Sequence, residues 1–524
     1  MIPPQCYTKT RDPDGSVHNP CYTCHVESRS PNYDSDEDLQ QGYDVPPSAR
    51  VNPWTNLFRD RRGFVAGVSD DQIDTWVKRS NYLSPDGNEL LLARALASPP
   101  RSWDLDNNGR FGGYTPDAWL NFDDAGFDRS PDGSLTGWRA FAYYPLAGSF
   151  FPTNGSSDDV LIRLPAEFRE RADGIFDRTV YAVNLAIVEA LIKRHDVAID
   201  AVDERTLGLD IDRNGRLARA TVVKYDWAPL KKRYMHYVGR ARRLSDEISP
   251  PQISAGLFPV GTEFLHSVRY LDVTTGRVSM ASRMKELRYA RKARWMTYGE
   301  LEVLGQEETR EKRSKPERVP TFRGNAELGL WNSKGWRFQG FIEDTNGHLR
   351  PQTFAESTPC VGCHGGIGVT DDSIISFARK LDSASAFRRG WYHWSERGFE
   401  GLAEPRRADG KFEYTQYLMT AGAGDEFRSN DEVQRTFFDE SGQLRAEKVT
   451  ELHRDISKLL LPTLERARAL NKAYLAVVKE QSYEFGREAM LRPATNVWST
   501  LPEAEQTGVA TSLAAFWQPA AAAK

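Results

Sequence analysis

"HNPCYTCHVES", residues 18–28, contains two cysteines separated by two residues, and a histidine directly follows the second cysteine. The same arrangement returns near the other end of the chain as "CVGCH", residues 360–364. The 524-residue chain has five cysteines, and Cys6 alone lies outside these two pentapeptides. Two complete matches in a chain so poor in cysteine indicate a shared chemical role rather than chance.

A Cys-x-x-Cys-His run is typical of covalent haem attachment. Two thiols add to the two vinyl groups of the porphyrin, and the two-residue spacer lets one helical turn reach both. The imidazole of the next residue then projects onto the iron as its proximal ligand. The sequence therefore predicts two haem c groups, with thioether anchors at Cys21, Cys24, Cys360 and Cys363 and iron ligands at His25 and His364.

Two other chemistries use paired cysteines. A zinc site could take both pairs, but it would not require a histidine after each pair. A thioredoxin-like dithiol expects a strand-to-helix setting, whereas Asn19-Pro20 before the first pair indicates a turn. Haem is the favoured interpretation, and zinc and a redox dithiol are the alternatives.

On these two pentapeptides and their immediate flanks, the chain resembles the di-haem c-type cytochromes. The resemblance implies export, because haem c is attached outside the cytoplasm, and it implies a periplasmic or extracellular protein. Met1 runs into Ile2-Pro3-Pro4 with no basic start and no apolar stretch, so we expect that a leader has been removed. The long separation of the two sites departs from compact tandem di-haem proteins and from bacterial di-haem peroxidases.

The residue pattern predicts an α+β chain with three regions. Residues 1–130 form an irregular N-terminal haem-binding region with a calcium-like loop, since their first part is rich in Pro, Asp, Asn and Tyr. Residues 131–350 form a mixed, strand-rich middle, and residues 351–524 form a mainly helical haem domain. Within the middle region, the basic stretch 282–304 is predicted to be a helix. We expect the two chain ends to meet, because electrons pass only between nearby haems.

Two short loops share the pattern Asp-x-Asp-x-Asn-Gly, which is the first half of an EF-hand loop. The expected calcium ligands are Asp104, Asp106, Asn108 and the Arg110 carbonyl in one loop, and Asp210, Asp212, Asn214 and the Arg216 carbonyl in the other. Both loops lack the bidentate Glu at position 12, where Thr115 and Thr221 stand. Asp117 is a candidate replacement in the first loop, and a plain Asx-Gly turn is the alternative for both.

The distal side of each iron has three candidate ligands, Cys6, His18 and Met419. Cys6 is an odd thiol that could ligate as a thiolate or simply be buried. His18 could reach the other haem if the two sites pack together. Met419 follows Cys363 at a separation similar to that of the distal Met in small class I cytochromes c, although their nearby Pro is missing.

The composition and length of the chain limit the classes of function that it can have. A net charge of −4 gives no general attraction to nucleic acid, and no apolar run reaches the ~20 residues of a membrane span. The chain is long for two haems, which favours an exported redox enzyme in which one haem transfers electrons and the other binds a small substrate, in a peroxidase-like or other oxidoreductase reaction. The alternative is a periplasmic electron-transfer protein with two six-coordinate haems. Both need a redox partner protein, and the sequence identifies no catalytic residue.

Overall fold

A large antiparallel sheet forms the centre of the computed structural model, which describes residues 2–10, 20–33, 47–148, 151–315, 321–382, 386–421 and 430–503. Its nine strands run in the order β1-β2-β3-β6-β7-β10-β9-β8, with β11 paired to β10. The strands are β1 Phe127–Arg129, β2 Leu135–Phe141, β3 Ser157–Arg163, β6 Glu263–Asp272, β7 Ser279–Lys292, β8 Arg323–Asn325, β9 Gly329–Trp331, β10 Trp336–Glu343 and β11 Leu349–Pro351. A second sheet pairs β4 Val197–Asp203 with β5 Arg219–Val223.

The helices lie mainly before and after the strands. The N-terminal part has short 3-10 turns, η1 Pro4–Tyr7, η2 Pro20–Thr23, η3 Pro47–Ala49 and η4 Thr55–Phe58, and then α2 Arg62–Gly67, α3 Asp70–Lys78 and α4 Leu91–Ala97. The middle has α5 Arg178–Lys193, α6 Glu204–Leu207, α7 Arg242–Asp246 and α8 Tyr298–Ser314. The C-terminal part has α9 Phe354–Cys363, η9 Phe377–Arg379, α10 Glu413–Ala421, α11 Asp431–Phe437, α12 Ala446–Arg454, α13 Ser457–Leu460 and α14 Leu464–Glu480. The predicted α+β class, with an irregular start, a strand-rich middle and a helical end, is confirmed.

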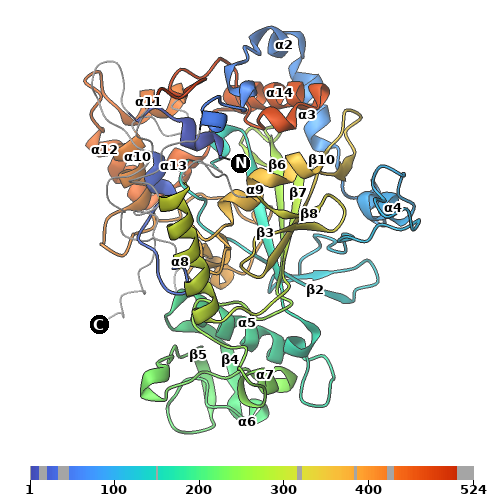
Figure 1. The fold of residues 1–524 in the computed structure, drawn as a ribbon, viewed down its shortest axis with the longest axis vertical. Helices are drawn as coiled ribbons and strands as arrows, with labels where there is room; N and C mark the ends of the chain where they lie inside the picture. Colours follow the sequence, from blue (N-terminus) through green and yellow to red (C-terminus); the bar gives the residue numbers. More distant parts are fainter. Residues whose placement is uncertain are drawn as a thin grey trace.

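The sheet is buried on both faces. Residues directly opposite each other in antiparallel strands point to the same face, so Phe264 and Ala290 share one face and Leu265 and Tyr289 share the other. The first face packs against α5 and the segment after α9, and the second packs against the region of α4. In Figure 1, α9 crosses one side of the sheet, while α5, α6 and α7 lie at one end of the molecule beside β4 and β5.

The predicted helix over residues 282–304 is wrong for its first half. Residues 279–292 form β7, a central strand. Its charged side chains are buried in ion pairs on both faces: Arg283 with Glu343, Glu286 with Arg487, and Lys292 with Asp372. Because polar residues occupy both faces, the strand shows no alternation of apolar and polar residues. The second half forms α8, which begins with a capping box at Thr297.

The two ends of the described chain lie side by side. Thr8 pairs with Val497 and Val51 pairs with Thr500 as isolated antiparallel bridges. Apolar side chains from both ends then share one cluster, which includes Tyr7, Trp54, Met490 and Val497. The expected meeting of the chain ends is confirmed.

Candidate functional site

The second Cys-x-x-Cys-His motif lies at the end of α9. Thr353 and Glu356 form a capping box that starts the helix: the Thr353 Oγ1 accepts from the Glu356 N–H at 3.2 Å, and Glu356 accepts from the Thr353 N–H at 2.8 Å. The helix ends at Cys363, and the His364 N–H donates to the Cys360 carbonyl at 3.2 Å. Cys360 and His364 are therefore one helical turn apart, as haem attachment requires.

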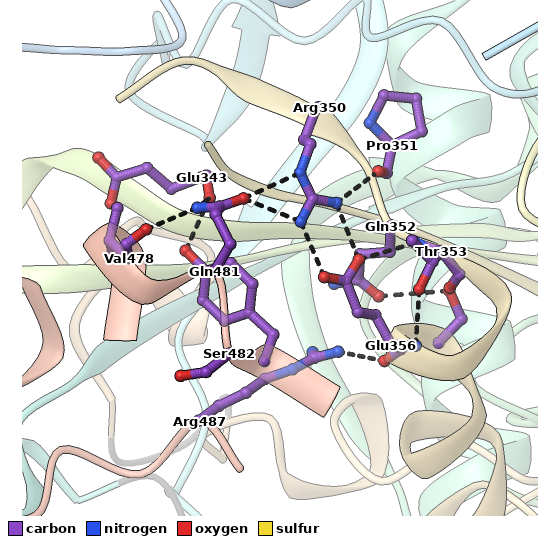
Figure 2. A network of polar contacts seen from close by, with 12 residues as sticks. Glu343, Arg350, Pro351, Gln352, Thr353, Glu356, Val478, Gln481, Ser482 and Arg487 are labelled. Carbon is purple, nitrogen blue, oxygen red and sulfur yellow. Dashed lines mark hydrogen bonds and ion pairs between the residues drawn. The ribbon is translucent and has the colours of Figure 1, made fainter. Parts of the chain in front are cut away.

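A polar network holds the start of this helix (Figure 2). Arg350 donates to both carboxylate oxygens of Glu356 at 2.8 Å and to Gln481 Oε1 at 3.0 Å. Arg487 donates to the Glu356 main-chain carbonyl and, at 2.7 Å, to Glu286 on β7. Burial would raise the pKa of Glu356, but its bonds to Arg350 outweigh burial and lower it. The helix that carries the motif is thus tied to β7, β11 and the end of α14.

His364 is prepared for metal ligation. Its Nδ1 lies 2.6 Å from the Ser373 carbonyl, which can only accept, so the ring proton is on Nδ1 and the lone pair is on Nε2. Burial, together with the nearby positive charges of Arg288 and His266, lowers the pKa of His364 to about 4. The imidazole is therefore neutral at pH 7. A neutral ring whose other nitrogen donates to a carbonyl is the usual state of a metal-bound histidine.

Polar side chains of the sheet lie close to this motif. His266 on β6 and Arg288 on β7 are direct cross-strand neighbours on the face that α9 covers. His266 Nε2 lies 2.9 Å from Asp158 Oδ2, and the Tyr143 hydroxyl donates to the same oxygen. The side chains of His266 and Arg288 are 21 % and 26 % exposed, although both belong to central strands. Two partly exposed polar side chains of the sheet thus lie beside the motif, a placement that the sequence did not reveal.

Two guanidinium groups lie near Cys360. Burial would lower the pKa of Arg288 and of Arg487, but Glu286 and Cys360 act in the opposite direction and raise both. Glu286 accepts from Arg288 at 3.0 Å and from Arg487 at 2.7 Å, so one carboxylate holds both cations beside the thiol.

The first motif forms a tight turn. The N–H groups of Cys24 and His25 donate to the Cys21 carbonyl at 3.1 and 2.9 Å. The side chains of Cys21, Cys24 and His25 are partly exposed. The turn η2 lies against η1, which carries Cys6, and against α10. This geometry brings both thiols of the motif to one short turn.

The two motifs are neighbours in space. The Val369 N–H, five residues after His364, donates to the Cys24 carbonyl at 3.1 Å. Val26, Leu146 and Val369 form one buried cluster, and Cys24 packs against it. The structure therefore brings together two sites from opposite ends of the sequence, which allows electron transfer between groups bound at both.

The three candidate distal ligands have different surroundings. Met419 is 63 % exposed, and Tyr414, Tyr417 and Leu418 form the buried face of its helix, α10. Cys6 is partly buried against the apolar cluster of the chain ends. His18 lies outside the described residues. Among the histidines, sequence reasoning had no signal to single out His266, whose role depends on strand register.

The alternatives to haem find less support in the geometry. Among the described side chains, which exclude that of Cys363, no cysteine belongs to a group of three close potential metal ligands. A redox dithiol gains reactivity at a helix N-terminus, whereas Cys360 and Cys363 lie in the last turn of α9.

The two calcium-like loops each gain a carboxylate that the sequence did not predict. Asp104 and Asp106 meet Glu327, and Asp210 and Asp212 meet Glu204, with ligand oxygens within 4.8 Å of one another. Glu327 comes from the turn between β8 and β9, and Glu204 is the first residue of α6. Both are almost fully buried. Each loop therefore brings a third carboxylate close to its two aspartates.

The expected substitute, Asp117, is engaged elsewhere. It accepts from Arg163 at 2.6 Å and from the Trp138 indole at 2.8 Å, and it lies outside the acidic group of the first loop. The turns themselves are the same in both loops: Asp104 accepts from the Gly109 N–H, and Asp210 accepts from the Gly215 N–H, each at 2.8 Å.

Comparison with known proteins gives a family. The model of a lipoprotein family matches residues 1–454. A protein named "Uncharacterized lipoprotein" from Aquifex aeolicus (strain VF5) is 30 % identical over 577 aligned residues, which cover 98 % of this chain and 90 % of the relative. No solved structure matches the chain. None of the described helices is long and apolar enough to cross a membrane.

These findings correct the resemblance to di-haem c-type cytochromes. That resemblance rested on two pentapeptides, whereas the lipoprotein match extends over most of the chain. A short ligand motif can occur on unrelated folds, so it does not define a family. The assignment to cytochrome c and to electron transport as a class is wrong. Export is confirmed at the level of the family: the chain belongs to this family of lipoproteins.

Proposed function

We propose that this lipoprotein is an exported redox enzyme that attaches haem at both Cys-x-x-Cys-His motifs and acts on a small substrate beside the second. The observation that carries the proposal is His364, whose Nδ1 is held by the Ser373 carbonyl while its Nε2 lone pair is available to a metal. Bound haem supplies a one-electron redox centre at each motif. The anchors are the cysteines of the motifs, and the proximal ligands are His25 and His364.

The surroundings of the two motifs support different roles. Val26, Leu146 and Val369 form an apolar cluster beside the first motif, which suits electron transfer without substrate. The second motif faces His266 and Arg288, which water can reach. The Asp158 carboxylate orients the His266 ring, so that the imidazole can give up and accept a proton. The Arg288 guanidinium can hold a polar or anionic substrate.

A peroxide is the substrate class that this arrangement suits best. Reduction of hydrogen peroxide to two waters consumes two protons and two electrons. One electron can be held at each motif, a redox partner protein can supply both, and His266 can deliver protons. The periplasm or the cell exterior is the compartment that fits an exported protein with covalent haem.

The cysteine pairs give the direct test. We expect the wild-type protein, made in a host that exports it and attaches haem c, to hold two covalent haems. Cys360→Ala/Cys363→Ala is expected to retain only the first haem and Cys21→Ala/Cys24→Ala only the second, since each pair serves one porphyrin. Pyridine haemochrome absorbance per protein is the measurement. Cys6→Ala is the control and should retain both haems; stoichiometric zinc without a haem band would contradict the proposal.

Electron transfer without a substrate is the competing function. Substitution of His266 distinguishes this function from that of an enzyme. If the protein is an enzyme, His266→Ala should leave the spin state of the haems unchanged and slow the reaction with peroxide. If His266 is instead a sixth ligand, the same change should convert a low-spin haem to a high-spin one in the EPR spectrum. His348→Ala, at a side chain that is 72 % exposed, is the matched control.

We also propose that the two acidic loops bind Ca²⁺, because Glu327 and Glu204 complete the carboxylate sets of the two loops. The ions would brace the loops and take no part in the chemistry. Calcium at about 100 times its Kd should raise the free energy of unfolding by about 2.7 kcal/mol per site.

Removing one carboxylate tests each calcium site separately. Glu327→Gln and Glu204→Gln should each abolish binding at one site, as measured by titration calorimetry. Asp132→Asn, in a similar Asx turn outside both acidic groups, should leave calcium binding unchanged. Calcium-independent stability of the wild-type protein would contradict this proposal.

A further inference from the structure

A short hairpin, residues 227–234, projects from the part of the molecule that contains β4, β5 and α7. Ala228 and Arg233 pair through hydrogen bonds of 3.0 and 3.2 Å. Lys232 adopts a left-handed conformation that closes the turn. At the base, the rings of Trp227 and Tyr234 pack edge to face with centroids 5.9 Å apart. The hairpin is thus an ordered feature and holds its tip in a defined position.

The tip combines an apolar residue with cations. Leu230 is 102 % exposed, more than any other large hydrophobic side chain in the described ranges. Lys231, Lys232 and Arg233 follow it and are exposed. Arg233 pairs with Asp226 at 3.0 Å, whereas neither lysine has an ion pair within the part of the chain that the structure describes. Two cations without an ion pair among the described residues therefore directly follow a leucine that is fully exposed.

The order of these residues matches the layers of a membrane surface. The leucine at the apex would enter the boundary of the acyl chains. The lysines would lie among the headgroups, where anionic lipids attract them. The aromatic pair at the base would lie in the interface that Trp and Tyr prefer. A single exposed leucine is common and needs no explanation by itself; the two lysines without an ion pair that directly follow Leu230 are what call for one.

We propose that the hairpin 227–234 docks onto an anionic lipid surface. A protein partner is less suitable, because a specific protein interface covers ~800 Å² on each side and a narrow tip with one leucine presents far less. Membership of a lipoprotein family adds support, since such proteins work beside a membrane. This inference does not depend on the proposed redox function.

Docking at this position would orient the molecule. The hairpin belongs to the end of the protein that holds β4, β5 and α7, and α2 lies at the opposite end (Figure 1). A second attachment beside a lipid anchor strengthens membrane binding. The hairpin supplies such a second attachment and faces one end of the protein toward the lipid.

Vesicle co-sedimentation of the full chain without an acyl group tests this proposal. We expect binding to vesicles of equal parts phosphatidylcholine and phosphatidylglycerol, release by salt, and no binding to pure phosphatidylcholine. Lys231→Glu/Lys232→Glu should weaken binding at least ~25-fold, since each lysine contributes about fivefold. Leu230→Ser should weaken it severalfold and leave the salt dependence in place.

The matched controls lie at the other end of the molecule. Phe64→Ser changes a side chain of α2 that is 40 % exposed, and Lys78→Glu reverses an exposed charge of α3. Both should bind vesicles as the wild type does. Equal binding by wild type and Lys231→Glu/Lys232→Glu would overturn the proposal, as would a wild-type protein that ignores the mixed vesicles but binds an acidic protein. Haem content is measured in the same samples and should not change.

Discussion

Replacing Lys292 by methionine is expected to lower the free energy of unfolding by about 3–5 kcal/mol. Lys292 and Asp372 form an ion pair of 2.6 Å in which the side chains are 0 % and 1 % exposed. Asp372 also accepts from the Phe258 N–H at 3.0 Å. Methionine keeps most of the volume of lysine but removes the charge, so the carboxylate stays buried without its cation.

The pH dependence of Lys292→Met follows from the same carboxylate. Burial already raises the pKa of Asp372 above its ordinary value of 3.8, even though Lys292 lowers it. Without the lysine the folded-state pKa rises further, so the folded protein binds a proton that the unfolded chain has lost. The variant should therefore lose stability as pH rises from about 4 to the new folded-state pKa.

A surface pair gives the control for Lys292. Lys448 and Glu451 are 37 % and 46 % exposed, and Lys448→Met should cost less than about 1 kcal/mol. Lys292→Met/Asp372→Asn removes both charges and should recover part of the loss. Urea unfolding followed by tryptophan fluorescence measures all three variants. A loss no larger than that of Lys448→Met would show that the buried pair does not hold the segment before Ser373.

The backbone geometry of the second motif was predictable from the sequence because it is local. The spacing of Cys360, Cys363 and His364 requires one helical turn, and the chain forms that turn at the end of α9. The Asp-x-Asp-x-Asn-Gly pattern likewise predicts its own turn. Membership of a protein family, by contrast, depends on the whole chain. The ten residues of the two motifs could not identify the family.

The rest of the site depends on contacts between distant residues. His266 gains its position from the register of β6 against β3 and β7. Glu327 contacts a loop that lies more than two hundred residues earlier, as its bond to the Leu105 N–H shows. The strand β7 was mistaken for a helix because its charges are neutralised by partners such as Glu343 and Arg487, which only the fold brings near.

Replacing Glu189 by glutamine is expected to lower the free energy of unfolding by about 3–5 kcal/mol at pH 7. Glu189 on α5 binds Lys193 at 2.9 Å and Lys380 at 3.1 Å, and all three side chains are at most 3 % exposed. Lys193 also donates to the Lys380 carbonyl at 2.6 Å. Glutamine preserves the shape but removes the carboxylate that both buried lysines share.

The loss of stability in Glu189→Gln should depend on pH, whereas a loss caused by altered packing alone would not. Burial lowers the pKa of Lys380 from 10.5 to about 7, although Glu189 opposes this. In the wild type, stability therefore rises with pH between about 7 and 10.5, where only the unfolded chain keeps the proton. In Glu189→Gln the folded-state pKa falls below 7. As pH decreases below 7, the variant should lose about 1.4 kcal/mol per pH unit relative to the wild type.

Urea unfolding of both proteins between pH 5 and pH 9 measures this difference. Glu451→Gln changes an exposed carboxylate and should show neither the loss nor its pH dependence. A deficit in Glu189→Gln that stays constant below pH 7 would mean that Lys380 keeps its charge without Glu189. In that case its other hydrogen bonds, such as the one to the Arg389 carbonyl at 2.7 Å, would have to stabilise the ammonium group.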